Sequence, residues 1–266
     1  MRLVIGLLIG LFACGTVAAS EKVDQLAEAL QLSQIMEILR KEGQAHRQEL
    51  DETHLDQKGG SFLEAQVEDI YDTVWMQSQI TSALTENLTS VQMDQAILFF
   101  ESAVGKTVVS LENSARDAIS DETIEEMARH AYENEPRDDK FFKLVDEYIQ
   151  VNDLINQNVQ NSLSADFFFF RGLDLEESQD DAELWAQLLA QTKERTEDAT
   201  VWLYSFLLLA YQPLTEAQMR ENIAFSRTDT GRALNKALFT GFDQMFDEIS
   251  YQLGRAVAHS MRASDL

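Results

Sequence analysis

The chain has 266 residues, 45% of them hydrophobic, and a formal net charge of −25. A nucleic-acid-binding protein needs a basic surface to meet the phosphate backbone, so the acidic balance excludes that class. Two prolines and eleven glycines are few for this length, which favours helices over folds built of short strands.

The first 19 residues have the features of a secretory signal peptide. Arg2 supplies the positive end, and the apolar run at 3–13 is too short to span a bilayer. Small residues at 17–19 form a cleavage site before Ser20. We therefore expect an exported, periplasmic protein with no membrane span in the mature chain.

Cys14 leaves a second possibility for this segment. It is the only cysteine, and the stretch LFACG at 11–15 resembles the box of bacterial lipoproteins. Cleavage before Ser20 removes Cys14, whereas lipidation makes Cys14 the anchored N-terminus. In both cases the protein is exported and does not depend on disulfides.

Apolar residues recur with the helical period along the mature chain, and no segment alternates as a β-strand does. A loop containing two glycines lies at 56–61, and a break containing a proline lies at 134–139. We expect helices at 22–42, 62–84, 90–101, 103–134, 139–163, 180–211, 216–227 and 229–262.

One phrase occurs twice: LTSVQMDQAILFFESAVGK begins at Leu88, and LTEAQMRENIAFSRTDTGR begins at Leu214. A tryptophan also recurs upstream, as Trp75 and Trp202, and we expect both in the core. Self-similarity of this kind indicates repeated structural units. We predict an all-α protein of two homologous helical-bundle domains that arose by internal duplication. Their predicted limits are 20–135 and 136–266.

Each copy of the phrase begins with a capping box. Thr89 and Gln92 in the first copy, and Thr215 and Gln218 in the second, have the required spacing. In this motif the threonine oxygen accepts from the third helical amide, and the glutamine side chain reaches back to the cap amide. Each copy therefore predicts the start of a short helix.

Each copy then restarts as a long helix. Ser102 and Thr228 are suited to cap it, and Gly105 and Gly231 follow three residues later. A glycine inside a helix costs about 1 kcal/mol relative to alanine, and it is tolerated where another backbone comes close. We expect a close contact between two helices at each glycine.

This pattern of a capped short helix, then Phe, Ser, a hydrophobic residue, Gly and a basic residue resembles an exported bacterial family catalogued as domain of unknown function 2059. The first copy carries it at 88–106 and the second, more weakly, at 223–232. Ala103 and Asp229 stand where that family often has proline, and Ser226 stands where it often has an aromatic residue. The resemblance implies two tandem copies of a periplasmic, all-helical domain. It implies no activity and no catalytic residues.

The sequence contains no recognisable motif for a metal, nucleotide or cofactor, and we expect none to be bound. Glu126 and His130 lie one helical turn apart on one face. They are the pair most suited to acid–base chemistry in a hydrolase, although a solvated Glu–His contact is much the simpler explanation.

Four consecutive phenylalanines, Phe167, Phe168, Phe169 and Phe170, have no counterpart in the other half. One helical stripe cannot bury all four. They either plug the core where a helix meets the other domain or form an apolar site for a partner protein or small ligand.

We expect a non-catalytic binding or interaction protein of the cell envelope, with a cleft between the halves lined by Phe167 to Phe170. Two alternatives remain: a hydrolase that uses Glu126 and His130, and a structural spacer. The spacer predicts buried phenylalanines and no pocket.

Overall fold

The structure is a computed structural model that describes residues 13–55, 59–176 and 178–264. Its regular elements are α-helices, and these three ranges contain no β-strand. The predicted all-α class is confirmed. Most of the predicted signal peptide lies outside the described residues, at 1–12, and its last residues begin the first helix.

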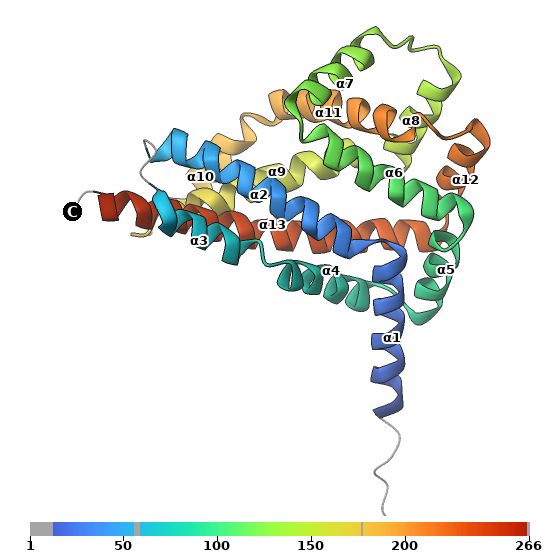
Figure 1. The fold of residues 1–266 in the computed structure, drawn as a ribbon, viewed down its shortest axis with the longest axis horizontal. Coiled ribbons are helices and arrows are strands. Elements are labelled where there is room, and N and C mark those ends of the chain that lie inside the picture. The colour runs from blue at the N-terminus through green and yellow to red at the C-terminus, as the bar shows by residue number, and fades with distance from the viewer. Residues whose placement is uncertain (1–12, 56–58, 177, 265–266) are drawn as a thin grey trace, which may run out of the picture.

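The described chain forms a series of helices joined by short connections (Figure 1). Their bounds are α1 Ala13–Ala29, α2 Leu32–His54, α3 Gly60–Ile70, α4 Thr73–Asn87, α5 Ser90–Phe100, α6 Ala103–Ile119, α7 Glu122–Asn134, α8 Lys140–Val151, α9 Leu154–Leu173, α10 Asp181–Leu189, α11 Thr192–Tyr211, α12 Glu216–Ser226 and α13 Asp229–Ser264.

Two predicted helices are interrupted by a residue in the left-handed region. The helix expected at 22–42 breaks at Gln31, with φ 53°, and the one expected at 139–163 breaks at Asp153, with φ 51°. A non-glycine residue seldom adopts this conformation, so tertiary packing holds the two breaks. The expectation of continuous helices there was wrong.

Three further predicted helices also divide. Asp72 accepts the amide of Trp75 and begins α4, and Asp121 accepts the amide of Thr123 and begins α7. An aspartate that caps a new helix stabilises the break in the old one. The predicted helix at 180–211 likewise divides into α10 and α11.

Helices α1 to α6 form one series and helices α8 to α13 form a second, and the two series share the same order of features. Each series has a left-handed break after its first helix, an 11-residue capped helix as its fifth, and a sharp corner into its sixth. This likeness agrees with the repeated phrase. The origin of the two series by duplication stays a prediction.

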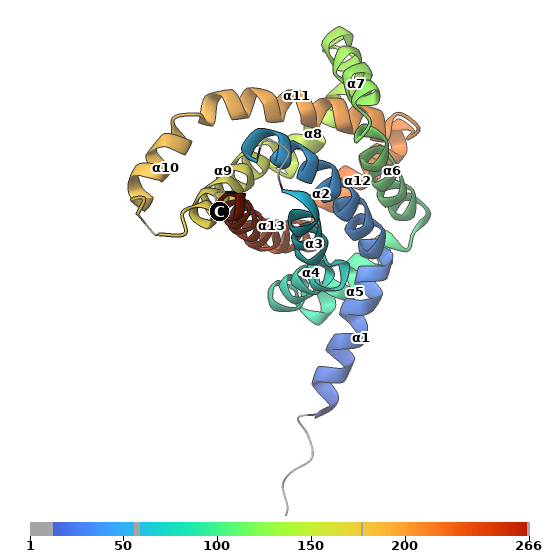
Figure 2. The same ribbon diagram turned by 60° about the vertical axis from the view of Figure 1, so that its left-hand side comes forward.

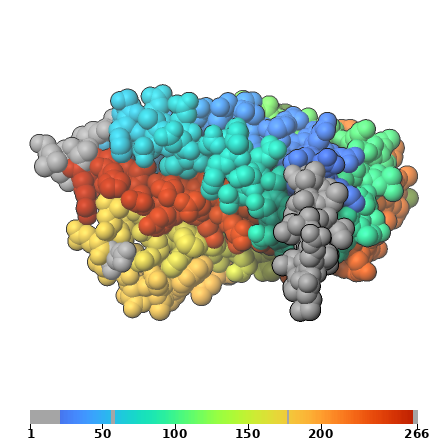
Figure 3. All heavy atoms as spheres, turned by 90° about the horizontal axis from the view of Figure 1, so that it is seen from below, coloured from blue at the N-terminus to red at the C-terminus, as the bar shows by residue number. Residues whose placement is uncertain are grey.

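The last helix of each series packs into the hydrophobic cluster of the other series. The first hydrophobic cluster combines residues of α1 to α6 with Leu234 to Val257 of α13. The second combines Val108 and Ala115 of α6 with residues of α8, α11 and α12. Figure 2 shows α13 almost end-on, surrounded by α2, α3, α4 and α9, and Figure 3 shows it running between the two series. The sequence boundary predicted at 135 and 136 is therefore crossed by both cores.

Both capping boxes are formed. The Thr89 amide donates to Gln92 Oε1 over 2.9 Å, and the Gln92 amide donates to Thr89 Oγ1 over 3.3 Å. The Thr215–Gln218 pair repeats this geometry at 3.0 and 3.3 Å. These contacts satisfy amides that the first turn of a helix otherwise leaves unpaired.

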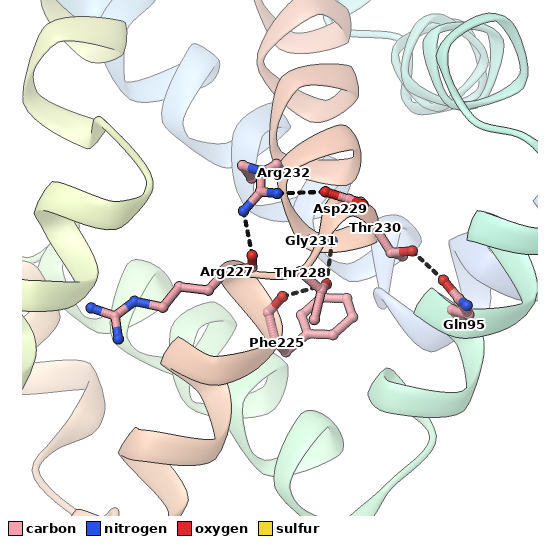
Figure 4. Close-up of polar contacts among 8 residues, drawn as sticks. All are labelled: Gln95, Phe225, Arg227, Thr228, Asp229, Thr230, Gly231 and Arg232. Atoms are coloured by element: carbon pink, nitrogen blue, oxygen red, sulfur yellow. Dashed lines mark hydrogen bonds and ion pairs between the residues drawn. The ribbon is translucent and has the colours of Figure 1, made fainter.

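The corner between α12 and α13 is closed by polar contacts (Figure 4). The Thr228 hydroxyl donates to the Phe225 carbonyl over 2.7 Å and accepts from the Gly231 amide over 2.9 Å. The Thr230 hydroxyl donates to the side-chain oxygen of Gln95 in α5. Hydrogen bonds thus fix the direction of α13 at its own corner with α12, and they also tie its first turn to α5.

The two glycines lie where the corners are tightest. A Cβ atom on Gly105 would lie 2.2 Å from the Phe99 carbonyl oxygen, and one on Gly231 would lie 2.1 Å from that of Phe225. The close neighbour is the backbone of the preceding short helix. The rings of Phe99 and Phe225 stack on each other with centroids 4.0 Å apart, so the two corners meet.

Removing either cap should weaken the fold. We predict that Thr89→Ala and Thr215→Ala each lower the free energy of unfolding by roughly 0.5–2 kcal/mol, because each leaves one first-turn amide unpaired. Urea unfolding followed by circular dichroism measures the loss. The control is Thr85→Ala at an exposed position in the last turn of α4, which should cost little. Equal midpoints for all four proteins would refute the role of the capping boxes.

Candidate binding site

Aromatic and aliphatic side chains from several helices surround a cavity of about 510 Å³. Helices α2, α6, α8, α9, α11 and α13 contribute to its wall, so both series build it. Its apolar lining includes Ile35, Leu39, Leu154, Trp202, Leu203, Phe206, Leu207, Phe239, Phe242 and Phe246. Cavities of this size and character hold small molecules in many proteins.

A smaller, more polar cavity of about 170 Å³ adjoins the first. The two share four lining residues, Ile35, Glu112, Tyr148 and Phe242. The polar lining of the smaller cavity also includes Asn113, Asn152, Asn222, Ser226 and Asn235. We call the small cavity the polar end and the large one the apolar chamber.

Glu112 lies where the apolar chamber and the polar end meet. It projects from the same part of α6 as the buried Val108, Val109 and Ala115. The Tyr211 hydroxyl donates a hydrogen bond to its carboxyl. Burial raises the pKa of Glu112 to about 7, and the bond from Tyr211 opposes that rise only in part. At neutral pH the carboxyl therefore exists in both protonation states.

Two tyrosines support this carboxyl. Tyr211 of α11 is fully buried, and its ring packs edge-on against Tyr148 of α8 with centroids 5.5 Å apart. Burial, and then the neighbouring Glu112 charge, raise the pKa of both phenols well above the ordinary value. Both hydroxyls therefore keep their protons at physiological pH and remain hydrogen-bond donors.

Arg116, the one cationic side chain in the wall of the apolar chamber, is already paired. Its Nε and Nη2 donate to the two oxygens of Glu42 over 2.9 and 2.8 Å. This two-point contact ties α6 to α2 and neutralises the guanidinium charge. The site therefore offers no free positive charge to an anion.

Trp202 was expected in the core, and the structure places it at the wall of the chamber. Its indole is partly exposed and stacks on Phe206 with centroids 5.1 Å apart. The rings of Phe242 and Phe246 on α13 face the same space and are also partly exposed. The cavity is thus a groove between helices with aromatic walls.

The four consecutive phenylalanines are spread around α9. Phe167 stacks on Trp185 with centroids 4.5 Å apart, Phe169 packs against the first cluster, and Phe170 is 38% exposed. This turn lies close against α13, since a Cβ on Gly254 would be 2.1 Å from the Phe169 carbonyl oxygen. The part of α9 that lines the chamber lies earlier, at Leu154 to Ala165. Ligand binding by Phe167, Phe168, Phe169 and Phe170 stays a prediction.

Glu126 and His130 are both exposed on α7. The side-chain amide of Asn134 contacts the His130 ring over 3.4 Å and donates to the His130 carbonyl over 2.7 Å. Neither side chain lines the chamber. In the described part of the chain, no group of three or more His, Cys, Asp or Glu side chains is placed to hold a metal ion.

Sequence reasoning missed the polar end, although the repeat contained a signal for it. Asn222 and Ser226 stand one turn apart on the buried face of α12, where the first copy has the apolar Ala96 and Phe100. Glu112 likewise stands where the second copy has Leu238. Polar residues that interrupt an apolar face in only one copy mark a feature that the shared fold does not require.

Comparison with known proteins adds one family. Residues 75–133 match the family model described as "Uncharacterized protein conserved in bacteria (DUF2059)". The DUF2059 segment runs from α4 to α7 and includes the first corner and Glu112. It agrees with the resemblance carried by the first phrase, whereas a second tandem copy stays a prediction. No curated protein and no solved structure matches the chain.

Glu112 should make the fold less stable as pH rises. Because the native carboxyl holds its proton more tightly than the unfolded chain does, the free energy of unfolding falls between pH 4.5 and about 7. We predict that Glu112→Gln removes this loss, so its stability relative to the unaltered protein increases by roughly 3 kcal/mol from pH 4.5 to pH 8. Urea unfolding across that range measures the difference.

The exposed Glu126→Gln is the matched control for this measurement. Its stability relative to the unaltered protein should stay nearly constant over the same pH range. If Glu112→Gln behaves like Glu126→Gln, the Glu112 carboxyl is not desolvated.

Proposed function

We propose that this is an exported, periplasmic binding protein without catalytic activity, and that it holds an apolar small molecule in the chamber between its two helical series. The observation that carries the proposal is the cavity of about 510 Å³ with aromatic walls. A fold that needed only stability would pack such rings against one another and leave little empty volume.

Export is supported by the N-terminal sequence and by the family resemblance. We propose that the mature protein begins at Ser20, with a lipid anchor on Cys14 as the alternative. Within the described residues, none of the helices combines the length and apolarity needed to cross a bilayer. A protein partner in the envelope is compatible with the same groove, since it can receive an apolar side chain.

The spacer alternative has less support. It predicts that all four phenylalanines are buried and that no pocket exists, whereas Phe170 is 38% exposed and the chamber is present. A hydrolase built on Glu126 and His130 has no support from geometry, because the two side chains lie on an exposed face of α7. Neither alternative accounts for the aromatic lining.

One observation favours enzymatic chemistry as a second candidate. The pKa of Glu112 is about 7, which suits a general acid or base at neutral pH, and the carboxyl lines a cavity. Binding remains the better proposal because the surrounding tyrosines and amides stabilise a polar group without supplying a nucleophile. A catalytic activity of the unaltered protein that disappears in Glu112→Gln would make the enzyme the better proposal.

An apolar fluorescent probe tests ligand binding directly. We predict that 1,6-diphenyl-1,3,5-hexatriene binds with one site per chain and that Ala165→Trp, which fills the chamber, weakens binding at least 10-fold. Ala186→Trp on the exposed face of α10 is the control and should leave the affinity unchanged. Fluorescence titration gives both constants. No saturable binding to the unaltered protein, or equal affinity in the two variants, would contradict the proposal.

A further inference from the structure

The polar end holds buried groups that the fold does not need. Asn222 is 3% exposed, and among the described residues no acceptor meets its side-chain nitrogen at hydrogen-bonding geometry. Burial and the Glu112 charge raise the pKa of the nearby Tyr148, and a side-chain contact from Asn222 lowers it, but this contact falls outside the geometry that would satisfy the amide. Buried polar groups are nearly always paired in native proteins, so an unpaired amide that lines a cavity needs an explanation.

Glu112 is also incompletely paired. Among the described residues, Tyr211 is the one group that donates to its carboxyl, and the donor reaches a single oxygen, Oε1. The second oxygen belongs to a side chain that lines both cavities. The polar end therefore presents an acceptor at Glu112 and donors at Asn222 and Tyr148.

We propose that the polar end binds an uncharged head group that both donates and accepts hydrogen bonds, a hydroxyl or an amide, on an amphipathic molecule whose apolar body fills the chamber. The inference rests on the proposed function and specifies its ligand. Such a head donates to Glu112 and accepts from Asn222, so it satisfies both groups at once.

Charged heads fit less well. A carboxylate or phosphate can only accept hydrogen bonds, and it would be repelled by the ionised form of Glu112 while Arg116 stays bound to Glu42. An ammonium group can only donate, so it would leave the Asn222 amide unpaired beside the Tyr148 hydroxyl. The net charge of −25 also opposes the approach of anions.

The comparison between the two copies of the phrase supports a dedicated site. In the second copy, Asn222 and Ser226 stand at the positions that Ala96 and Phe100 occupy in the first, and they line the polar end together with Phe100 itself. The Ser226 hydroxyl donates to the Asn222 carbonyl over 3.2 Å and accepts from Asn152 over 3.4 Å. The ring present at Phe100 is thus exchanged for a small hydroxyl, which leaves space next to Asn222.

Three probes with the same 12-carbon chain and different heads test the inference at pH 7.5. We expect 1-dodecanol to displace 1,6-diphenyl-1,3,5-hexatriene at concentrations at least 10-fold lower than dodecanoate or dodecylammonium. The two charged probes are kept below their micellar range, and dodecanol is kept below its solubility limit. Asn222→Leu should reduce this preference to within about 2-fold and leave binding of the fluorescent probe nearly unchanged.

Asn158→Leu is the matched control. It removes an amide from the wall of the apolar chamber, and that amide is already satisfied by the Leu154 carbonyl at 2.8 Å. The preference for dodecanol should persist in this variant. Tyr148→Phe, which removes one hydroxyl at the polar end, gives a second reading if Asn222→Leu does not fold, and it should also weaken the preference.

The outcomes separate the inference from the proposed function. Equal displacement by the three probes, or preference for a charged one, overturns the head-group assignment while the chamber remains a binding site. A preference that survives in both Asn222→Leu and Tyr148→Phe overturns it as well, and the polar end then holds water only. Failure of the fluorescent probe to bind the unaltered protein overturns both proposals.

Discussion

The contact between the two corners determines the rest of the architecture. Phe99 and Phe225 stack at the point where α5 turns into α6 and α12 turns into α13. Each corner can turn sharply because glycine lets the new helix approach the backbone of the old one. The corners send α6 and α13 in directions that place each of them in the hydrophobic cluster of the other series. Stability in either series therefore depends on a helix supplied by the other.

The exchange also explains why the chamber and the polar end lie between the two series. The chamber and the polar end are bounded by α6 and α13 together with helices of both series. A site at this junction responds to any change in how the series pack, because its walls belong to both. Ionising the half-buried Glu112 carboxyl costs stability above neutral pH, and groups with a pKa shifted in this way are concentrated at functional sites.

The sequence predicted the features that depend on neighbours along the chain. Thr89 and Thr215 were recognisable as caps because their partners lie three residues away, and the helical class followed from periodicity. The break at Gln31 was not predictable, since tertiary contacts hold its left-handed backbone.

The environment of Glu112 depends on Tyr211, 99 residues later, and no local pattern brings those residues together. Four consecutive phenylalanines suggested an apolar site at Phe167 to Phe170, whereas the chamber is lined by isolated aromatic residues of α11 and α13.

Native mass spectrometry of the protein isolated from its own cell envelope tests the central claim most directly. We predict a polypeptide that carries one small apolar compound, released on unfolding, and we expect Ala165→Trp purified in the same way to lack the added mass. A bare polypeptide from the unaltered protein, or the same adduct on both proteins, would contradict a ligand held in the chamber.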